Sequence, residues 1–129
     1  MKLDFIDSLN SYGEKVVRLY DFGMEESIAF RDGLVEFINN DKPYIKLTDF
    51  PFIEARNCQL ALFKSDADEG IISEDNENFF CAMTIDGYKK MVGLIEPFCN
   101  KEAKSYQFLY DLDNLTDFLF SPVGSWDED

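Results

Sequence analysis

Residues 56–97 carry the strongest pattern in the chain: RNCQLALFKSDADEGIISEDNENFFCAMTIDGYKKMVGLIEP. Within them, the run 58–63 (CQLALF) alternates between one firmly apolar set of positions and one mixed set, which predicts a β-strand with one buried face. The run 79–85 (FFCAMTI) is largely apolar at both sets of positions. It therefore predicts a central strand that is covered on both faces, as when a helix packs on one side.

An amphipathic helix is predicted to follow the second strand. Asp86 occupies the position of an N-cap, where a carboxylate accepts hydrogen bonds from the first free backbone N–H groups. Apolar residues then recur at i, i+3, i+4 and i+7, the spacing of one helical face: Tyr88, Met91, Val92 and Ile95. We expect Pro97 to end this helix, because proline lacks the N–H that a helix interior needs.

Residues 24–40 fit two interpretations. As a helix, the segment has two glutamates in its first turn, where the helix dipole favours acids, and it ends before Pro43. As a hairpin, it would place Asp32 and Gly33 in a type I′ turn between two short strands. We favour the helix, because both of its ends are marked and a glycine in its interior costs only about 1 kcal/mol.

Shorter elements complete the prediction. Residues 3–12 place apolar side chains three apart and Gly13 follows as a C-cap, so a short helix is expected there. Residues 115–119 are expected to form one closing helical turn. Further strands are expected at residues 16–20, 44–48 and 106–110.

Together these elements predict one α+β domain spanning residues 1–129, with an antiparallel-dominated sheet of four to five strands and helices packed on it. A chain of 129 residues, 46% of them hydrophobic, is long enough to bury a core without disulfides or metals. The 13 Phe and 6 Tyr exceed what a core of this size requires. We favour a Phe-rich core, and the alternative is an aromatic surface available to a partner.

The cysteines and the N-terminus bear on localisation. Cys58, Cys81 and Cys99 are odd in number, and two of them fall on predicted strand faces. We expect reduced thiols in a cytoplasmic protein instead of a disulfide framework. The N-terminus has no apolar signal region, and no run approaches the roughly 18–20 apolar residues that cross a bilayer, so no membrane association is expected.

Charge is the clearest functional signal in the chain. The formal net charge is −14, from 26 acids and 12 bases, and residues 65–129 hold 15 acids and only 4 bases. Direct nucleic-acid binding is disfavoured, since phosphate contacts need clustered Lys and Arg. The favoured partner is a basic protein surface, which long-range attraction would bring to the chain. The alternative is that the acidity only maintains solubility.

The residue types argue against catalysis and against a metal site. The chain has no histidine, which removes Ser–His and Cys–His nucleophile pairs and imidazole bases. Residues 66–77 imitate a calcium loop, with acids at positions 1, 3, 9 and 12. However, Ile71 stands at position 6, where the sharp turn of such a loop requires glycine. We therefore expect no enzyme activity, no cofactor and no bound metal.

A small, histidine-free, strongly acidic α+β domain without catalytic motifs resembles the immunity proteins that neutralise bacterial toxins, particularly contact-dependent growth inhibition toxins. The resemblance extends over the whole chain in size and character, and residues 106–126 are similar in character to such proteins. It implies a cytoplasmic inhibitor that forms a heterodimer with one cognate toxin domain, commonly a nuclease with a basic active site. Inhibition would be steric and electrostatic, or would use a shared sheet edge. The alternative is an acidic regulatory or DNA-mimic protein that binds several basic proteins.

Nine acids are the predicted partner-binding residues. From Ser65 to Tyr88 the chain has seven acids and no base, so no cation nearby in sequence neutralises their field. A binding role would explain why this self-repulsion is retained, and the alternative is a tolerant, solvated connection between strands. The predicted binding residues are Asp66, Asp68, Glu69, Glu74, Asp75 and Glu77 in the connection, and Asp111, Asp113 and Asp117 further along the chain.

Overall fold

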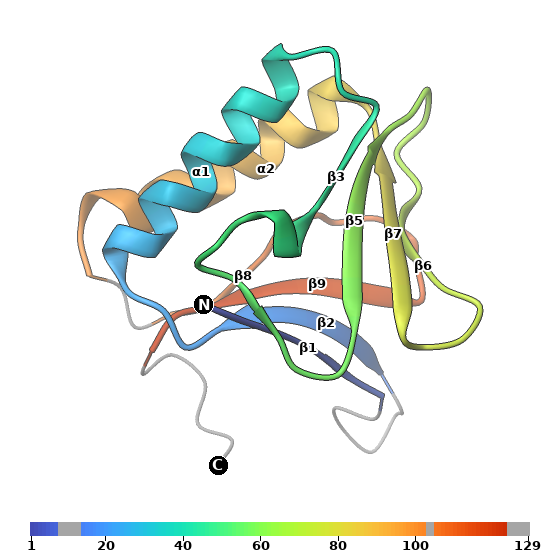
Figure 1. Ribbon diagram of the computed structural model, residues 1–129, viewed down its shortest axis with the longest axis horizontal. Helices are drawn as coiled ribbons and strands as arrows, with labels where there is room; N and C mark the ends of the chain where they lie inside the picture. Colours follow the sequence, from blue (N-terminus) through green and yellow to red (C-terminus); the bar gives the residue numbers. More distant parts are fainter. Residues whose placement is uncertain (8–13, 103–104, 124–129) are drawn as a thin grey trace.

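The computed structural model describes residues 1–7, 14–102 and 105–123. They form an α+β fold with two helices and two mixed sheets, one of five strands and one of four (Figure 1). The elements in chain order are β1 (Lys2–Ile6), β2 (Lys15–Tyr20), α1 (Met24–Asn39), β3 (Tyr44–Lys46), a 3-10 turn (Leu47–Asp49), β4 (Glu54–Ala55), β5 (Gln59–Lys64), β6 (Gly70–Ile72), β7 (Asn78–Met83), α2 (Ile85–Asn100), β8 (Gln107–Phe108) and β9 (Thr116–Ser121).

The five-stranded sheet has the strand order β4-β1-β2-β9-β8. β1 pairs antiparallel with β2 and parallel with β4, and β9 pairs parallel with β2 and antiparallel with β8. The helical turn predicted over residues 115–119 is therefore wrong, since these residues lead into β9. Phe118, Leu119 and Phe120 are all fully buried, as in a strand covered on both faces. One of the two strands that β9 pairs with, β2, lies near the other end of the chain.

The four-stranded sheet has the order β3-β5-β7-β6. Its central strands β5 and β7 are parallel, and the edge strands β3 and β6 pair antiparallel with them. The prediction of one antiparallel-dominated sheet is wrong in both respects, although the α+β class is confirmed. An alternating pattern identifies a strand, but it does not encode the direction of the neighbouring strand. The individual strands predicted at residues 16–20, 44–48, 58–63, 79–85 and 106–110 are confirmed as β2, β3, β5, β7 and β8, with β3 and β8 shorter than expected.

The N-terminal residues form a strand and not the expected helix. In β1, Leu3 and Phe5 are buried and their neighbours are half-buried, which is the alternation of a strand. The helix predicted over 3–12 relied on the spacing of Leu3 and Ile6 and gave no weight to Phe5 between them. Residues 8–13, which make up most of the rest of that segment, lie outside the described residues.

The helix favoured for residues 24–40 is confirmed as α1. Its first turn is capped by Glu26, whose side chain accepts a hydrogen bond from the Gly23 N–H at 3.3 Å. Gly33 in its interior allows the Phe50 ring to pack closely, because a Cβ there would lie 2.7 Å from that ring. The Asp32-Gly33 pair therefore belongs to a helix and not to a hairpin turn.

α2 starts and ends differently from the prediction. Its N-cap is Thr84 and not Asp86, because the Thr84 hydroxyl accepts a hydrogen bond from the Gly87 N–H at 2.9 Å. The helix also continues past Pro97 to Asn100. Pro97 is exposed and removes one backbone hydrogen bond, while the last turn remains packed on the core through the opposite side of the helix.

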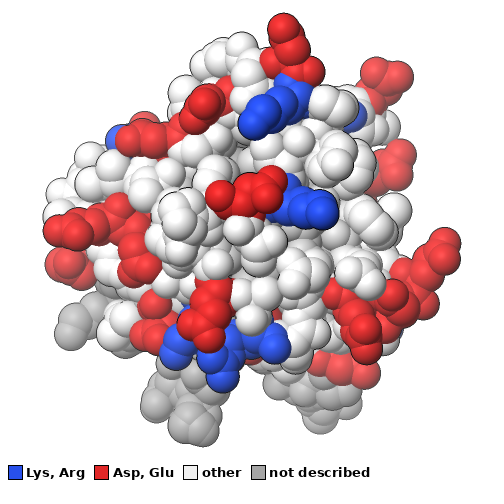
Figure 2. Space-filling model, in the orientation of Figure 1, with Lys and Arg blue, Asp and Glu red and all other residues white. Residues whose placement is uncertain are grey.

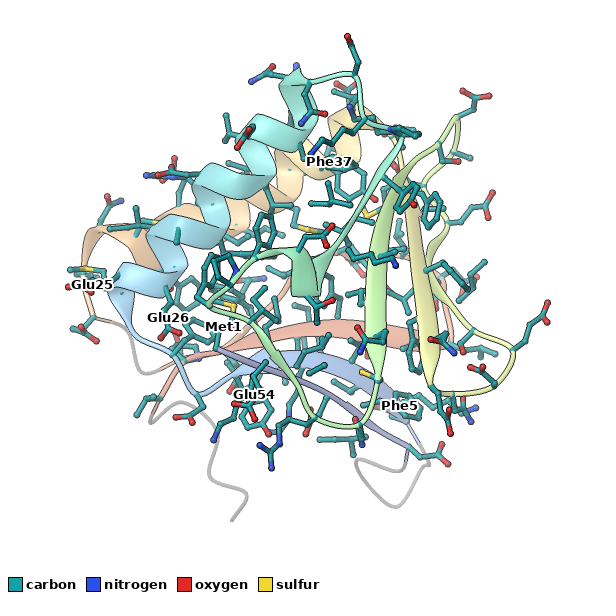
Figure 3. All side chains as sticks on the ribbon, in the orientation of Figure 1. Met1, Phe5, Glu25, Glu26, Phe37 and Glu54 are labelled. Carbon is teal, nitrogen blue, oxygen red and sulfur yellow. The ribbon has the colours of Figure 1, made fainter. Side chains whose placement is uncertain are left out.

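The helices and sheets enclose one core. Figure 1 shows α1 and α2 packed side by side, with the five-stranded sheet below them and the four-stranded sheet at their right. Aromatic contacts join these layers: the Phe5 and Phe79 ring centroids are 4.7 Å apart across the two sheets, and those of Phe37 and Tyr88 are 5.6 Å apart across the helices. Figure 3 shows Phe37 between α1 and the four-stranded sheet. A Phe-rich core is thus confirmed.

Two further expectations concerned the state of the cysteines and segments that could cross a membrane. Cys58, Cys81 and Cys99 are all buried and free, as predicted. Burial raises the pKa of the Cys58 and Cys81 thiols to about 12, so both stay protonated. Neither helix in the described part of the chain is both long and apolar enough to cross a bilayer.

Candidate partner-binding surface

Residues 65–77, here called the acidic segment, are not one open loop. β6 lies within them and pairs with β7, so the segment consists of two turns joined by a short strand. Ion pairs between described residues involve no acid of residues 65–88. Figure 2 shows acidic side chains along the right-hand side of the molecule, where Figure 1 places β6 and β7. Four acids of the segment are exposed and have no side-chain hydrogen bond to another described residue: Asp66, Glu69, Glu74 and Glu77.

Asp68 has a structural role that the sequence did not indicate. Its Oδ1 accepts hydrogen bonds from the backbone N–H and the hydroxyl of Thr84, both at 2.8 Å. These bonds, first from the Thr84 N–H and then from its hydroxyl, lower the pKa of Asp68 below its usual value. Asp68 thereby connects the acidic segment to the N-cap of α2, and one of its two carboxylate oxygens is already occupied.

Asp75 organises the second turn of the acidic segment. Its Oδ1 accepts hydrogen bonds from the backbone N–H groups of Asn78 and Glu77, both at 2.9 Å, and from the Ser73 hydroxyl at 3.2 Å. The bonds from Asn78 and Glu77 hold the pKa of Asp75 well below its usual range. This turn includes Asn76 with a φ of 59°, a backbone conformation that asparagine adopts more readily than most residues. The Ser-x-Asp-Asn order is the sequence signal that could have identified it.

Of the second predicted group, Asp111 and Asp113 lie between β8 and β9, and Asp117 lies on β9. Asp111 and Asp68 line the same hollow, of about 440 Å3, between α2 and the residues that follow β8. Lys90 lines this hollow too and, after the Thr84 bonds, contributes to lowering the pKa of Asp68. The side-chain amide of Asn114 donates to the Glu69 carbonyl at 2.5 Å, which ties the two acidic groups together. Asp113 is exposed, and Asp117 is half-buried on β9.

Asp117 carries a charge that the fold disfavours. Burial, followed by repulsion from Glu14 and Asp111, raises its pKa above the usual value of 3.8. A carboxyl group with a raised folded-state pKa stabilises the fold only when protonated, so stability falls as pH rises from 3.8 through the folded value. We therefore expect Asp117→Asn to increase the free energy of unfolding at pH 7 by about 0.5 kcal/mol or less. The thermal midpoint should be higher at pH 7 and unchanged at pH 3.

Thermal unfolding of this variant at both pH values checks the expectation, with the exposed Asp113→Asn as the matched control. A gain of the same size in Asp113→Asn would attribute the effect to net charge alone. A lower midpoint for Asp117→Asn at pH 7 would contradict the assignment.

The sheet edges offer little backbone to a partner. In the described part of the chain the edge strands are β3, β4, β6 and β8, and none is longer than three residues. The edge of β6 is also covered, because the Ile71 N–H donates to the Tyr110 hydroxyl at 3.1 Å and the Glu69 carbonyl accepts from Asn114. Short, covered edges are poor templates for strand addition. This geometry favours a partner contact through side chains over the addition of a strand to a sheet edge.

The outer face of the four-stranded sheet is a feature that the sequence prediction missed. Each strand contributes one large aromatic or aliphatic side chain to it, and these four are together called the open face: Tyr44 (β3), Phe63 (β5), Phe80 (β7) and Ile72 (β6). Lys46 of β3 is exposed on the same face. Tyr44 lies opposite Phe63, and Ile72 lies opposite Phe80, so these side chains point the same way. The exposed fractions of Tyr44, Phe80 and Ile72 are 43%, 43% and 50%.

β7 was predicted to be covered on both faces, and this is wrong. Its inner residues Phe79, Cys81 and Met83 are buried, but no described helix or strand covers Phe80 on the outer side. The apolar character of both sets of positions is equally typical of a strand with a helix on one face and a partner site on the other. The alternation therefore identified the strand without showing what covers each face.

The described residues contain no group of three or more His, Cys, Asp or Glu that could hold a metal ion.

We also compared the chain with known proteins. No protein-family model matches it, and the searches of curated proteins and of solved structures found no match.

Proposed function

We propose that this protein is a cytoplasmic immunity protein that binds one cognate toxin domain and neutralises it by covering a basic active site. The expected toxin is a nuclease, because an enzyme that binds the phosphates of nucleic acid has a basic cleft. The observation that carries the proposal is the run of seven acids without a base from Ser65 to Tyr88, whose charges no ion pair between described residues neutralises.

Electrostatics explains how such an inhibitor would work. The carboxylates of Asp66, Glu74 and Glu77 are exposed, so they interact with a partner through water before contact and speed the encounter. Asp68 and Asp75 accept hydrogen bonds from their own chain, and their lowered pKa values keep both ionised at neutral pH. They contribute fixed negative charge in place of free hydrogen-bond acceptors. The acidic segment would therefore present a negative electrostatic field to a basic cleft without any change in conformation or protonation.

The test first identifies a large secreted protein encoded immediately upstream of this chain and then uses the C-terminal domain of that protein. We expect co-production with this chain to restore growth to cells that the domain alone inhibits. We also expect the association rate to fall at least tenfold between 0.1 M and 1 M salt, since the Debye length shrinks from about 10 Å to about 3 Å. A rate that does not depend on salt would mean that the acidity serves solubility. Binding to many unrelated basic proteins with equal affinity would favour the DNA-mimic alternative.

The acids are expected to separate into a binding group and a structural group. The binding-group variant combines Asp66→Asn, Glu69→Gln, Glu74→Gln and Glu77→Gln. We expect it to keep its stability and to lose affinity at least tenfold, about 1.4 kcal/mol, because it removes four free charges without removing a hydrogen bond within the chain.

The control is Asp68→Asn. This change weakens the bonds that Asp68 accepts from Thr84 at the N-cap of α2, so we expect a lower unfolding midpoint with a smaller loss of affinity. Affinity can be measured by surface-based binding, and stability by thermal unfolding of the same samples. Unchanged affinity in the folded four-residue variant would remove the acidic segment from the interface.

A further inference from the structure

We propose that the open face of the four-stranded sheet is the docking site for a basic protein partner, with Phe80 and Ile72 as the anchor residues. This inference rests on the proposed function and locates its interface. It replaces the nine predicted acids as the centre of binding and assigns the nearby acids to the rim.

The open face is a continuous stripe of large side chains across four strands, with aromatic rings on β3, β5 and β7 and Ile72 on β6. The Tyr44 and Phe63 ring centroids are 4.9 Å apart and nearly parallel, and those of Phe63 and Phe80 are 5.8 Å apart and edge to face. Such cross-strand ring pairs hold the side chains in place. A partner would therefore meet rings that lose little conformational freedom on binding, which is typical of residues that dominate interface energies.

A hollow of about 390 Å3 lies at one end of this stripe. Ile72 and Phe80 form its apolar side, and Glu74 and Asp75 form its acidic side. An apolar centre with charged residues at its border is the usual organisation of a protein interface. Hydrogen bonds within its own turn fix the position of the Asp75 carboxylate. A lysine or arginine beside an apolar side chain on the partner fits this hollow in both charge and polarity.

The charge also argues against a second copy of this chain as the occupant. A two-fold symmetric dimer through the open face would bring the same patch of each copy together. Glu74 and Asp75 of one copy would then lie near those of the other, in molecules that each carry a formal net charge of −14. Like charges opposed across an interface are costly, so the complementary occupant is a basic surface.

The first experiment places the photo-crosslinking residue benzoylphenylalanine at position 80 and, as a control, at position 35 in the producing cell. Val35 is 38% exposed and belongs to α1, not to the four-stranded sheet. We expect position 80 to crosslink one basic protein and position 35 to crosslink none. Crosslinks between two copies of this chain, or equal capture of that protein from both positions, would overturn the inference.

The second experiment measures affinity for the captured protein after purification. We expect Phe80→Ala combined with Ile72→Ala to weaken binding at least 100-fold, about 2.8 kcal/mol, and the control Val35→Ala to change it less than about threefold. Ile72→Thr keeps the β-branched shape that suits a strand, so it reports on binding even if the double variant is unstable. Here we expect a loss of roughly tenfold.

The outcomes separate this inference from the proposed function. If a basic partner binds with salt-dependent kinetics but tolerates the changes at Phe80 and Ile72, the open face is not the anchor and the proposed function stands. If no basic protein is captured from either position and no growth protection is found, both fail. Loss of binding in the open-face variants with a stable fold supports the inference directly.

Discussion

Phe120→Ala is expected to destabilise the fold by about 3–5 kcal/mol, which is a large part of the 5–15 kcal/mol that a domain of this kind has in total. Phe120 on β9 is fully buried and contacts rings from three directions. Its ring centroid lies 4.5 Å from that of Phe22, 5.9 Å from that of Phe30 on α1 and 5.2 Å from that of Phe98 on α2. Truncation would remove all three contacts and leave a cavity where both helices meet the five-stranded sheet.

Urea unfolding followed by circular dichroism measures this loss, with Leu115→Ala as the control. Leu115 immediately precedes β9 and is 89% exposed, so its truncation should cost about 0.5 kcal/mol or less. If Phe120→Ala cost no more than this control, the aromatic cluster would not be the centre of the core.

The elements that the sequence predicted correctly have local signals. α1 has acids in its first turn, β5 alternates between apolar and mixed positions, and β7 is a short run that is apolar at nearly every position. The failures concern tertiary information. Residues 116–121 form a strand because they pair in parallel with β2. α2 continues through Pro97 because its last turn packs on the core. Neither condition is present in a window of neighbouring residues, which is all that a periodicity argument uses.

The candidate site shows the same division between local and tertiary signals. The density of acids in the sequence located the acidic segment. The structure was needed to show that Asp68 and Asp75 accept hydrogen bonds from the backbone, whereas other acids of the segment do not. The open face was harder to predict, because it depends on the register that sets Tyr44 beside Phe63 and Ile72 beside Phe80. A shift of one residue in either pairing would turn these side chains inward.

The two sheets differ in whether their charged side chains are paired within the chain. This difference supports placing the interface on the four-stranded sheet. On the outer side of the five-stranded sheet, the side chains of Arg18 and Asp4 are only 8% and 14% exposed and are bonded to each other. The charge of this pair is compensated within the chain. On the outer side of the four-stranded sheet, Tyr44, Phe80 and Ile72 are exposed beside the polar residues Lys46, Gln59 and Asn78. Glu74 and Asp75, at its border, form no ion pair between described residues. The first arrangement serves stability, whereas the second leaves interaction energy available to a partner.

Breaking the Arg18–Asp4 pair is expected to destabilise the fold by about 3–5 kcal/mol when only one partner is removed. The Arg18 guanidinium donates from Nε and Nη2 to the two Asp4 carboxylate oxygens at 2.8 and 3.1 Å, and it lies 3.9 Å from the centroid of the Tyr20 ring. Arg18→Met keeps much of the packing volume but leaves the Asp4 carboxylate buried without its cation. Asp4→Val removes the carboxylate that accepts both of these bonds from the guanidinium.

The double variant Arg18→Met with Asp4→Val is expected to be more stable than Arg18→Met alone, because the Asp4 carboxylate that the single change leaves without this cation is also removed. Urea unfolding of the four proteins at neutral pH provides the complete cycle, and the expected coupling is at least about 2 kcal/mol. Losses that simply add would mean that the two charges are already well solvated and that the pair contributes little. The open face would remain intact in all four proteins, so each folded variant should bind a partner with unchanged affinity. The same set of variants would then show that the five-stranded sheet contributes to stability without contributing to binding.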